Sequence, residues 1–253
     1  MTEARITALY RYPIKGLTPE ALTCVDLVAG ATMPFDRAYA IENGHGRFDP
    51  DAPRHLPKVN FVMLMRNERL ANLEARFDDA TTTLTILRAG RQVARGNLET
   101  PLGRRLLEQF LAAYMRDDLR GAPKIVSAPG HSFSDVPVKC LHVINLASVR
   151  ELERVAGRPI DPLRFRANVH IDGVPPFAER DWVNMPLRLG TVTTAVIDRT
   201  IRCEATNVDP STAARDMAIP SLLQRHWSRT DFGIYCKVEG PGSIAVGDAA
   251  ARV

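Results

Sequence analysis

The sequence predicts an α+β fold that is predominantly β, with barrel-like or sandwich-like sheets and only a few helices. Short apolar, β-rich runs recur along both halves of the chain, and Gly, Pro and Asn turn signals separate them. Three stretches have helical spacing and end signals, at 101–115, 146–156 and 220–227. A chain of 253 residues is also at the size where one domain gives way to two, so a large core is expected.

The first half of the chain is expected to form short strands joined by turns, at 6–12, 22–28, 37–41, 61–65, 73–77, 82–87 and 92–98. The helix over 101–115 follows, with Thr100 as its cap and Pro101 in its first turn. Its expected core face is Leu102, Leu106, Phe110 and Tyr114. Gly121-Ala122-Pro123 then marks a boundary, which predicts domains at 1–120 and 121–253.

The second half is expected to continue with strands at 124–127, 141–144, 165–171, 191–197, 232–238 and 244–246. Asn145 caps the helix at 146–156, and Gly157 ends it. Within 165–171, Arg166 and Asn168 alternate with apolar residues and therefore share one face. If that face lines a cleft, Arg166 can fork onto a phosphate and Asn168 can donate and accept; if it faces solvent, neither has a role.

Cys203 is the residue with the most distinctive chemistry. It follows an apolar β-rich run and has Arg199 and Arg202 close before it in the sequence. Nearby positive charge favours the thiolate, which is the nucleophilic and metal-binding form of cysteine. The alternative is that Cys203 is a small buried hydrophobe, as unpaired cysteines often are. The local sequence leaves both interpretations open.

Composition excludes several classes of function. The net charge is +4 with no run of like charge, which disfavours nucleic-acid binding. The four cysteines include no C-x-x-C pair, so neither a zinc knuckle nor an iron–sulfur cluster is indicated. No apolar stretch approaches the ~20 residues of a membrane span and no export signal is present, so no membrane association and a cytoplasmic location are expected. The residues at 131–135 include His, Ser and Asp, but they lack a nucleophile elbow and do not predict a hydrolase.

Several short motifs, taken together and in order, resemble those of MOSC domains, the family named after the C-terminus of molybdenum cofactor sulfurase. Residues 202–210 resemble the family's Arg-Cys…Thr-x-Val-Asp-Pro signature, and residues 164–169 resemble its Arg-Phe-Arg-x-Asn strand. Residues 232–235 with 241–248 resemble its closing hairpin. Tyr12 to Gly16 and Asp36-Arg37 resemble the β-barrel domain that precedes MOSC in the amidoxime-reducing branch. The resemblance implies an N-terminal MOSC-associated β-barrel domain followed by a MOSC β-barrel domain with a few helices.

The resemblance also implies a cofactor and a set of site residues. The cofactor is the molybdenum cofactor, molybdopterin with Mo, and pyridoxal phosphate is not expected. Cys203 is implied as the metal ligand and catalytic residue, Asp209 as a proton relay, and Ser134-Asp135 as the loop at the mouth of the site. The implied cofactor-binding residues are Lys15, Arg37, Asn145, Arg166, Asn168, Arg202, Thr206 and Asn207.

The function implied is a molybdenum-dependent oxidoreductase that reduces N-hydroxylated compounds such as amidoximes, hydroxylamines or N-hydroxylated bases. No cluster-binding region follows the MOSC segment, so electrons are expected from a separate protein of the ferredoxin, flavoprotein or cytochrome type. The alternative is a carrier that binds the cofactor, or a persulfide on Cys203, without turnover. Two residues depart from the family pattern: Gly16 stands where a serine follows the lysine, and Ile201 stands where serine is frequent.

Overall fold

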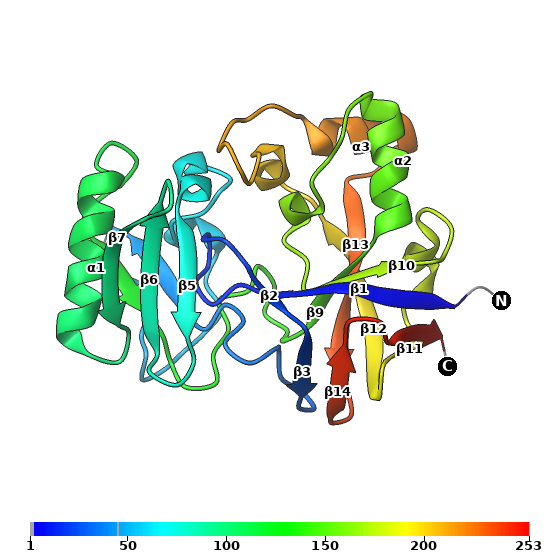
Figure 1. Ribbon diagram of the computed structural model, residues 1–253, viewed down its shortest axis with the longest axis horizontal. Coiled ribbons are helices and arrows are strands. Elements are labelled where there is room, and N and C mark those ends of the chain that lie inside the picture. The colour runs from blue at the N-terminus through cyan, green and yellow to red at the C-terminus, as the bar shows by residue number, and fades with distance from the viewer. Residues whose placement is uncertain (1–2, 45, 253) are drawn as a thin grey trace.

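The computed structural model describes residues 3–44 and 46–252 (Figure 1). The strands are β1 (Ala4–Arg11), β2 (Glu20–Leu22), β3 (Cys24–Leu27), β4 (Ala40–Asn43), β5 (Glu74–Asp78), β6 (Thr83–Arg88), β7 (Arg91–Asn97), β8 (Pro123–Val126), β9 (Leu141–Asn145), β10 (Val169–Asp172), β11 (Pro186–Leu189), β12 (Val192–Ile201), β13 (Asp231–Val238), β14 (Gly242–Ala245) and β15 (Ala249–Arg252). The helices are α1 (Pro101–Tyr114), α2 (Leu146–Ala156) and α3 (Ile219–Trp227), and the short 3₁₀ segments are η1 (Lys58–Asn60), η2 (Glu68–Asn72), η3 (Pro162–Phe165), η4 (Ala178–Trp182) and η5 (Glu204–Asn207).

Seven strands close into a barrel, in the order β10-β9-β13-β12-β11-β15-β1. The β1–β10 pair closes it, with Leu9 opposite Val169 and Ile6 opposite Ile171. Closure pairs every strand of the ring on both sides and leaves it without a free edge. The predominantly β fold with a barrel and few helices, predicted from the sequence, is confirmed.

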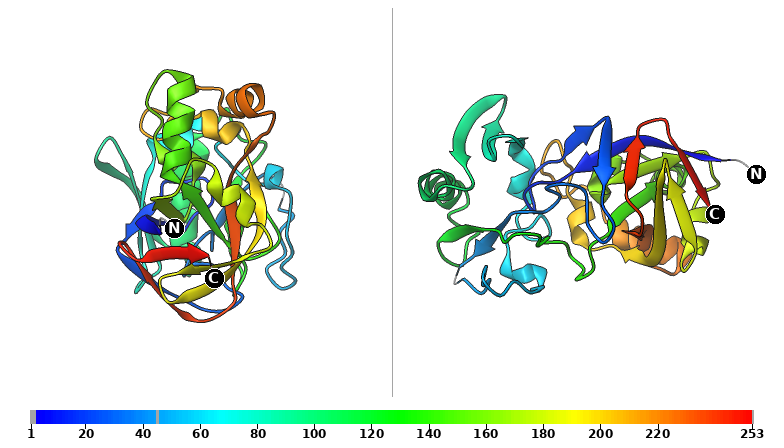
Figure 2. Two further views of the ribbon diagram at one scale, coloured as in Figure 1. Left: turned by 90° about the vertical axis from the view of Figure 1, so that its right-hand side faces the viewer. Right: turned by 90° about the horizontal axis from the view of Figure 1, so that it is seen from below.

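The barrel interior is filled by apolar side chains that alternate with outward residues along each strand. Helices α2 and α3 pack against each other on one side of the barrel (Figures 1 and 2). Under them lies a second cluster, in which the rings of Phe165 and Phe232 stack with centroids 4.1 Å apart. As predicted, the Asn145 side chain caps α2 by accepting from the Ala147 amide at 3.0 Å, and Gly157 ends it in the left-handed conformation.

The other strands form small sheets: β5-β6-β7, which carries α1, β4 with β8, and β3 with β14 (Figure 1). Two strands from the first part of the chain pair with strands from the second half. β1 pairs with β10 and β15, and β3 pairs with β14. Pairings therefore cross the expected boundary near residue 120, and the division into 1–120 and 121–253 stays a prediction.

The predicted core face of α1 is partly wrong, since Tyr114 is buried and Phe110 packs against the core but the two leucines do not. Leu102 and Leu106 are 63% and 48% exposed, and the buried positions are Gly103, Leu107, Leu111 and Tyr114. The helix is rotated by close backbone contact with β7: a Cβ on Gly103 would lie 2.1 Å from the Asn97 carbonyl oxygen. Only glycine permits this approach, so Gly103 faces the sheet and shifts the buried face by one residue.

The predicted strand at 165–171 is also partly wrong. Residues up to Phe165 form η3, Arg166 caps it with φ +52°, and β10 begins only at Val169. Arg166 and Asn168 therefore do not share a strand face. A backbone hydrogen bond keeps this segment in a turn instead of a strand, since the Arg166 amide donates to the Leu163 carbonyl at 3.0 Å.

Candidate functional site

A cavity of about 790 Å³ opens at the junction of the barrel and the loops of the first half. Its residues come from segments far apart in the sequence: Lys15, Gly16, Arg37, Lys58, Met63, Leu64, Met65, Ser134, Asp135, Cys140, His142, Arg164, Phe165, Arg166, Asn168, Arg202, Cys203, Ala205 and Tyr235. Six of these carry an arginine or lysine cation, and the only carboxylate among them is Asp135. The cavity is therefore a place for an anion.

Cys203 lies directly after β12, where the chain leaves the barrel and enters η5. It is partly exposed and lines the cavity, while Cys236 on neighbouring β13 is fully buried. The Cys203 carbonyl accepts from the amide of Thr206 at 3.1 Å and from its hydroxyl at 2.9 Å, which fixes the turn. Cys203 is thus held rigidly at a strand end and open to the cavity, and the interpretation as an inert core cysteine is wrong.

Of the two arginines near Cys203 in sequence, only Arg202 contributes to the cavity. Its guanidinium donates to the Phe165 carbonyl at 2.8 Å and lies 3.4 Å from His142 Nε2. Burial lowers the pKa of Arg202, and its Nε has no hydrogen-bond partner among the described residues. Arg199 instead donates to the Arg180 carbonyl at 3.1 Å and is absent from the cavity wall.

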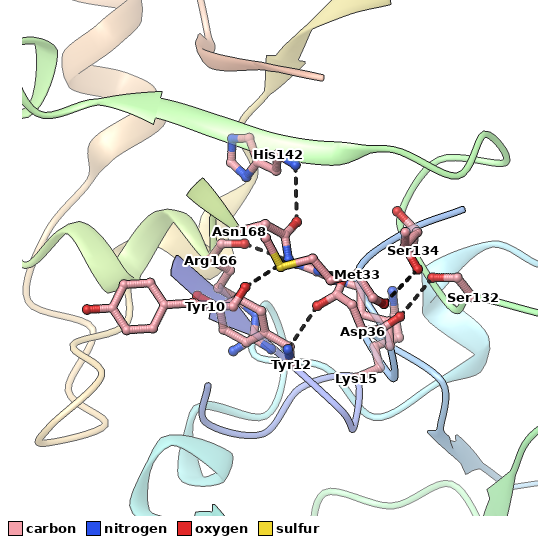
Figure 3. Close-up of polar contacts among 12 residues, drawn as sticks. Tyr10, Tyr12, Lys15, Met33, Asp36, Ser132, Ser134, His142, Arg166 and Asn168 are labelled. Atoms are coloured by element: carbon pink, nitrogen blue, oxygen red, sulfur yellow. Dashed lines mark hydrogen bonds and ion pairs between the residues drawn. The ribbon is translucent and has the colours of Figure 1, made fainter. Parts of the chain in front are cut away.

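Lys15, Arg37 and Arg166 form a cationic cluster beside Tyr12, in which Lys15 is buried and the two arginines are partly buried. Figure 3 shows Lys15 and Arg166 with Tyr12. The Arg166 and Arg37 guanidinium carbons lie 4.2 and 4.9 Å from the Tyr12 ring centroid. Burial lowers the pKa of Lys15, and burial with the neighbouring Arg37 charge lowers that of Arg166 to about 10. For Arg37, burial is outweighed by the Asp36 charge, which raises its pKa. Lys15 and Arg166 are therefore the less compensated cations, and an anion in the cavity would stabilise them.

Two acids partly balance this charge. Asp36 pairs with Arg37 and accepts from the Tyr12 amide at 2.8 Å. Asp135 pairs with Lys15, whose Nζ also donates to the Phe133 carbonyl at 2.8 Å. Burial alone would raise the pKa of Asp135, but the nearby cations outweigh burial and hold it below its usual range. The expectation that the Ser134-Asp135 loop lies at the mouth of the site agrees with this placement.

Arg37 and Arg166 both have backbone conformations that L-residues rarely adopt, with φ of +54° and +52°. Each such residue costs about 1–2 kcal/mol. The two segments hold each other, because Arg37 Nη2 donates to the Arg166 carbonyl at 3.0 Å and Arg166 Nη1 donates to the Leu17 carbonyl at 2.8 Å. The strained turns thus fix both guanidinium groups at the cavity.

Asn168 also reaches the cavity, as a bridge between strands. Its Oδ1 accepts from the His142 amide and its Nδ2 donates to the Tyr10 carbonyl, each at 3.1 Å (Figure 3). Both polar ends of the amide are therefore engaged by backbone, and Asn168 orders the cavity wall.

Four of the sequence-predicted site residues are not in the cavity wall. Asn145 caps α2 and donates to Glu179 at 3.1 Å, and Thr206 holds the Cys203 turn. Asn207 Oδ1 accepts from the Ile219 amide at 2.8 Å and so begins α3. Asp209 accepts from Arg164 and from the amides of Ser211 and Thr212. In this structure all four are occupied in shaping turns and caps.

The predicted set missed several cavity residues, notably Cys140, His142, Arg164 and Tyr235. His142 and Tyr235 face each other across the β9–β13 pair, with ring centroids 5.6 Å apart. Burial, then the Arg202 and Arg37 charges, hold the His142 pKa well below its usual value, so His142 is neutral; burial raises the pKa of Tyr235. Alternation within each strand predicts which face of the sheet a residue lies on. It does not predict which residues of β9 and β13 lie opposite each other.

The protein contains a closed β barrel with an apolar core. A cysteine near the end of one strand faces a cationic cavity. Two family models match the chain: the MOSC domain over residues 130–251 and the MOSC N-terminal beta barrel domain over residues 3–118. The chain therefore belongs to the MOSC-domain proteins that carry this N-terminal domain.

Named relatives match parts of the chain. It is 34% identical over 119 residues to the molybdenum cofactor sulfurase of Caenorhabditis briggsae, covering 44% of this chain and 16% of the relative. It is 30% identical over 125 residues to mitochondrial amidoxime reducing component 2 of Rattus norvegicus, covering 45% of this chain and 36% of the relative. The matches thus span only a minor part of these relatives. A crystal structure of the YUAD protein from Bacillus subtilis aligns over 99% of this chain and 97% of its own, with 13% identity and a TM-score of 0.45.

Within the described residues, no helix has the length and hydropathy needed to cross a membrane. The same residues contain no group of three or more His, Cys, Asp or Glu side chains arranged to hold a metal ion.

Proposed function

We propose that this protein is a molybdenum-cofactor-dependent oxidoreductase that reduces N-hydroxylated compounds with electrons from a separate donor protein. The observation that carries the proposal is the single cavity in which Cys203 faces a cluster of poorly compensated cations. The names of the sulfurase and amidoxime-reducing relatives support the same cofactor.

The residues of the cavity fit this cofactor, which is a pterin dithiolene that carries a phosphate. Lys15, Arg37 and Arg166 would hold the phosphate, and the orphaned Nε of Arg202 offers a further donor. Cys203 would supply one soft ligand, as thiolates do for such metals. Gly16, where the family pattern has serine, provides no side-chain donor, so its neighbours must hold the phosphate alone.

The proposed reaction takes one N–OH compound, two electrons and two protons to the corresponding N–H compound and water. When bound, the cofactor would supply the oxygen-accepting, two-electron chemistry. Asp209, the proton relay expected from the sequence, is held in a turn by Arg164 and backbone amides and is not among the residues that line the cavity. Tyr235 lines the cavity, and burial raises the pKa of its hydroxyl, so Tyr235 is proposed as a proton source in place of Asp209.

The donor protein is proposed to be of the ferredoxin, flavoprotein or cytochrome type. The substrate is proposed to be a small N-hydroxylated molecule, and a cytoplasmic location stays a prediction from the sequence. The alternative of a cofactor or persulfide carrier uses the same cavity without turnover.

Metal and pterin analysis of protein made in a host that synthesises the cofactor tests the proposal. We expect bound molybdenum, pterin fluorescence after oxidation, and reduction of benzamidoxime by a chemical reductant. Metal and pterin without N–O reduction would favour the carrier. Protein from that host with neither metal nor pterin would contradict both functions.

A further inference from the structure

A second, smaller cavity adjoins the cationic cavity. The two share five wall residues: Gly16, Leu64, Arg164, Arg166 and Ala205. Ala205 is only two residues beyond Cys203, so the shared wall belongs to the loop that holds the cysteine. We call the second cavity the apolar annex.

The character of the annex is opposite to that of its neighbour. Beyond the shared wall, it is lined by Leu17, Thr18, Pro19, Ala71, Leu163, Val208 and Pro210. Thr18 is the only one of these with a polar side chain, and its hydroxyl already accepts from the Ala75 amide at 2.8 Å. The annex therefore offers hydrocarbon surface and no free charge of its own, directly beside a cavity lined by cations.

The two arginines at the shared wall each have protein partners, although Arg164 Nε has none among the described residues and Arg166 keeps the capacity assigned above to the phosphate. Arg164 forms ion pairs with Asp209 and Asp216, each at 2.8 Å. Arg166 donates to the Leu17 carbonyl at 2.8 Å and lies against the Tyr12 ring. With Gly16, Leu64 and Ala205, these two side chains form the wall that the two cavities share.

The annex is also preformed. Val208 is 2% exposed, and the Arg164 side chain fixes the preceding Asn207 carbonyl at 3.2 Å. Pro19 and Pro210 restrict the backbone on two sides. A preformed apolar pocket binds a flat or branched hydrocarbon group with little ordering cost, whereas a small polar molecule gains nothing there.

We propose that the annex binds the aryl or alkyl group of the substrate and makes the enzyme selective for N-hydroxylated compounds with a substantial apolar group. This inference rests on the proposed function, because it assumes that the N–O group lies in the cavity with Cys203. Benzamidoxime would fill the annex with its ring, whereas acetamidoxime would leave it empty. Both react with two electrons from the donor and two protons to give the amidine and water.

The first test fills the annex. Ala71→Leu places a larger side chain in it from η2, and Ala178→Leu is a matched control in η4, on a separate surface cavity beside Val174. We expect Ala71→Leu to lower the ratio of kcat/KM for benzamidoxime over acetamidoxime about tenfold, within the range set by apolar groups in pockets. The control should keep the wild-type ratio. An unchanged ratio in folded Ala71→Leu protein would overturn the inference.

A second measurement does not depend on turnover. Ligand-observed fluorine NMR of 4-fluorobenzamidoxime should show binding that Ala71→Leu weakens about tenfold and Ala178→Leu does not. If this pattern holds while no amidoxime is reduced, the reductase proposal fails and the annex stands. If amidoximes are reduced but both variants bind the probe like the wild type, the annex alone fails.

If Ala71→Leu does not fold, Leu163→Ala provides the opposite change, since it enlarges the annex. It should raise the preference for an amidoxime with a naphthyl group over benzamidoxime about threefold or more. A preference that stays at the wild-type value would contradict the inference just as clearly.

Discussion

The barrel interior and the cavity beside it follow opposite rules. Inside the barrel, side chains such as Ile171 and Ile234 are fully buried, alternate in the expected way and match their strands. At the cavity, Arg37 and Arg166 have positive φ, and Arg202 is buried with an orphaned Nε. This difference indicates that the closed barrel supplies enough stability to tolerate local backbone strain and buried charge at the cavity beside it.

Cys203, two residues beyond the end of β12, and Cys236 on β13 give the largest contrast. Cys203→Ala should lower N-hydroxy reduction at least about 100-fold and change the free energy of unfolding by less than about 0.5 kcal/mol. Cys236→Ala should cost about 1–2 kcal/mol of stability, because it leaves a void in a sealed core, and should keep activity in the folded protein. Urea unfolding and benzamidoxime turnover measure both. If Cys203→Ala loses as much free energy of unfolding as Cys236→Ala and keeps its activity, Cys203 is a structural residue and the prediction is wrong.

Two isoleucines compare the barrel with the cavity region by the free energy of unfolding alone. Ile171 is fully buried in the barrel wall, whereas Ile201 beside the site is 69% exposed. Ile171→Ala should lower the free energy of unfolding by about 2–5 kcal/mol, and Ile201→Ala by less than about 0.5 kcal/mol. Equal losses for the two variants in urea titrations would show that the barrel is not the stabilising region.

Acid should weaken the barrel wall at His170. Burial lowers its pKa to about 4, and its Nε2 has no partner among the described residues. The unfolded chain binds a proton there below about pH 6.5. Because the folded protein does not bind that proton until about pH 4, the free energy of unfolding falls as the pH is lowered through this window.

His170→Phe keeps an aromatic ring beside Tyr10 and removes the titrating group. Its urea midpoint should fall less than that of the wild type between pH 7 and pH 5, a difference of about 1–2 kcal/mol in free energy of unfolding. Parallel decreases in the two proteins would assign the acid sensitivity to other groups, His142 first among them.

The smallest effect isolates the strain at the cavity. Arg166→Gly and Arg166→Ala both remove the guanidinium and should lower pterin retention alike. Glycine accepts φ +52° without strain, so Arg166→Gly should be more stable than Arg166→Ala by about 0.5–1 kcal/mol. Ala113→Gly on the exposed face of α1 should show the reverse sign, a loss of about 1 kcal/mol. Finding alanine the more stable residue at position 166 would exclude strain there.

Much of the fold was predictable because local patterns and tertiary packing agree in the barrel. The alternation in β1 and β11, the cap at Asn145 and the strand end before Cys203 all follow from short-range rules. The α1 face was missed because the contact between Gly103 and Asn97 rotated the helix. No periodicity within one helix encodes a backbone contact with a distant strand.

The candidate site was predictable only in part, for a related reason. Lys15, Arg37, Arg166, Asn168, Arg202 and Cys203 line one cavity, as the motifs indicated. Asn145 and Asp209 carry equally suitable chemistry, yet caps and turns engage them elsewhere. A side-chain type shows what a residue can bind, and only the surrounding backbone shows whether that capacity is already used.

By itself, the sequence determined a mainly β protein with few helices and a cysteine at the end of a strand, because each of these depends on neighbours along the chain. Only the tertiary structure decided that β1 closes the barrel against β10, that His142 meets Tyr235, and that an apolar annex adjoins the cationic cavity. Those features depend on register and on contacts between residues more than 90 positions apart. These long-range contacts form together when the barrel closes, so the sequence of a single segment does not specify them.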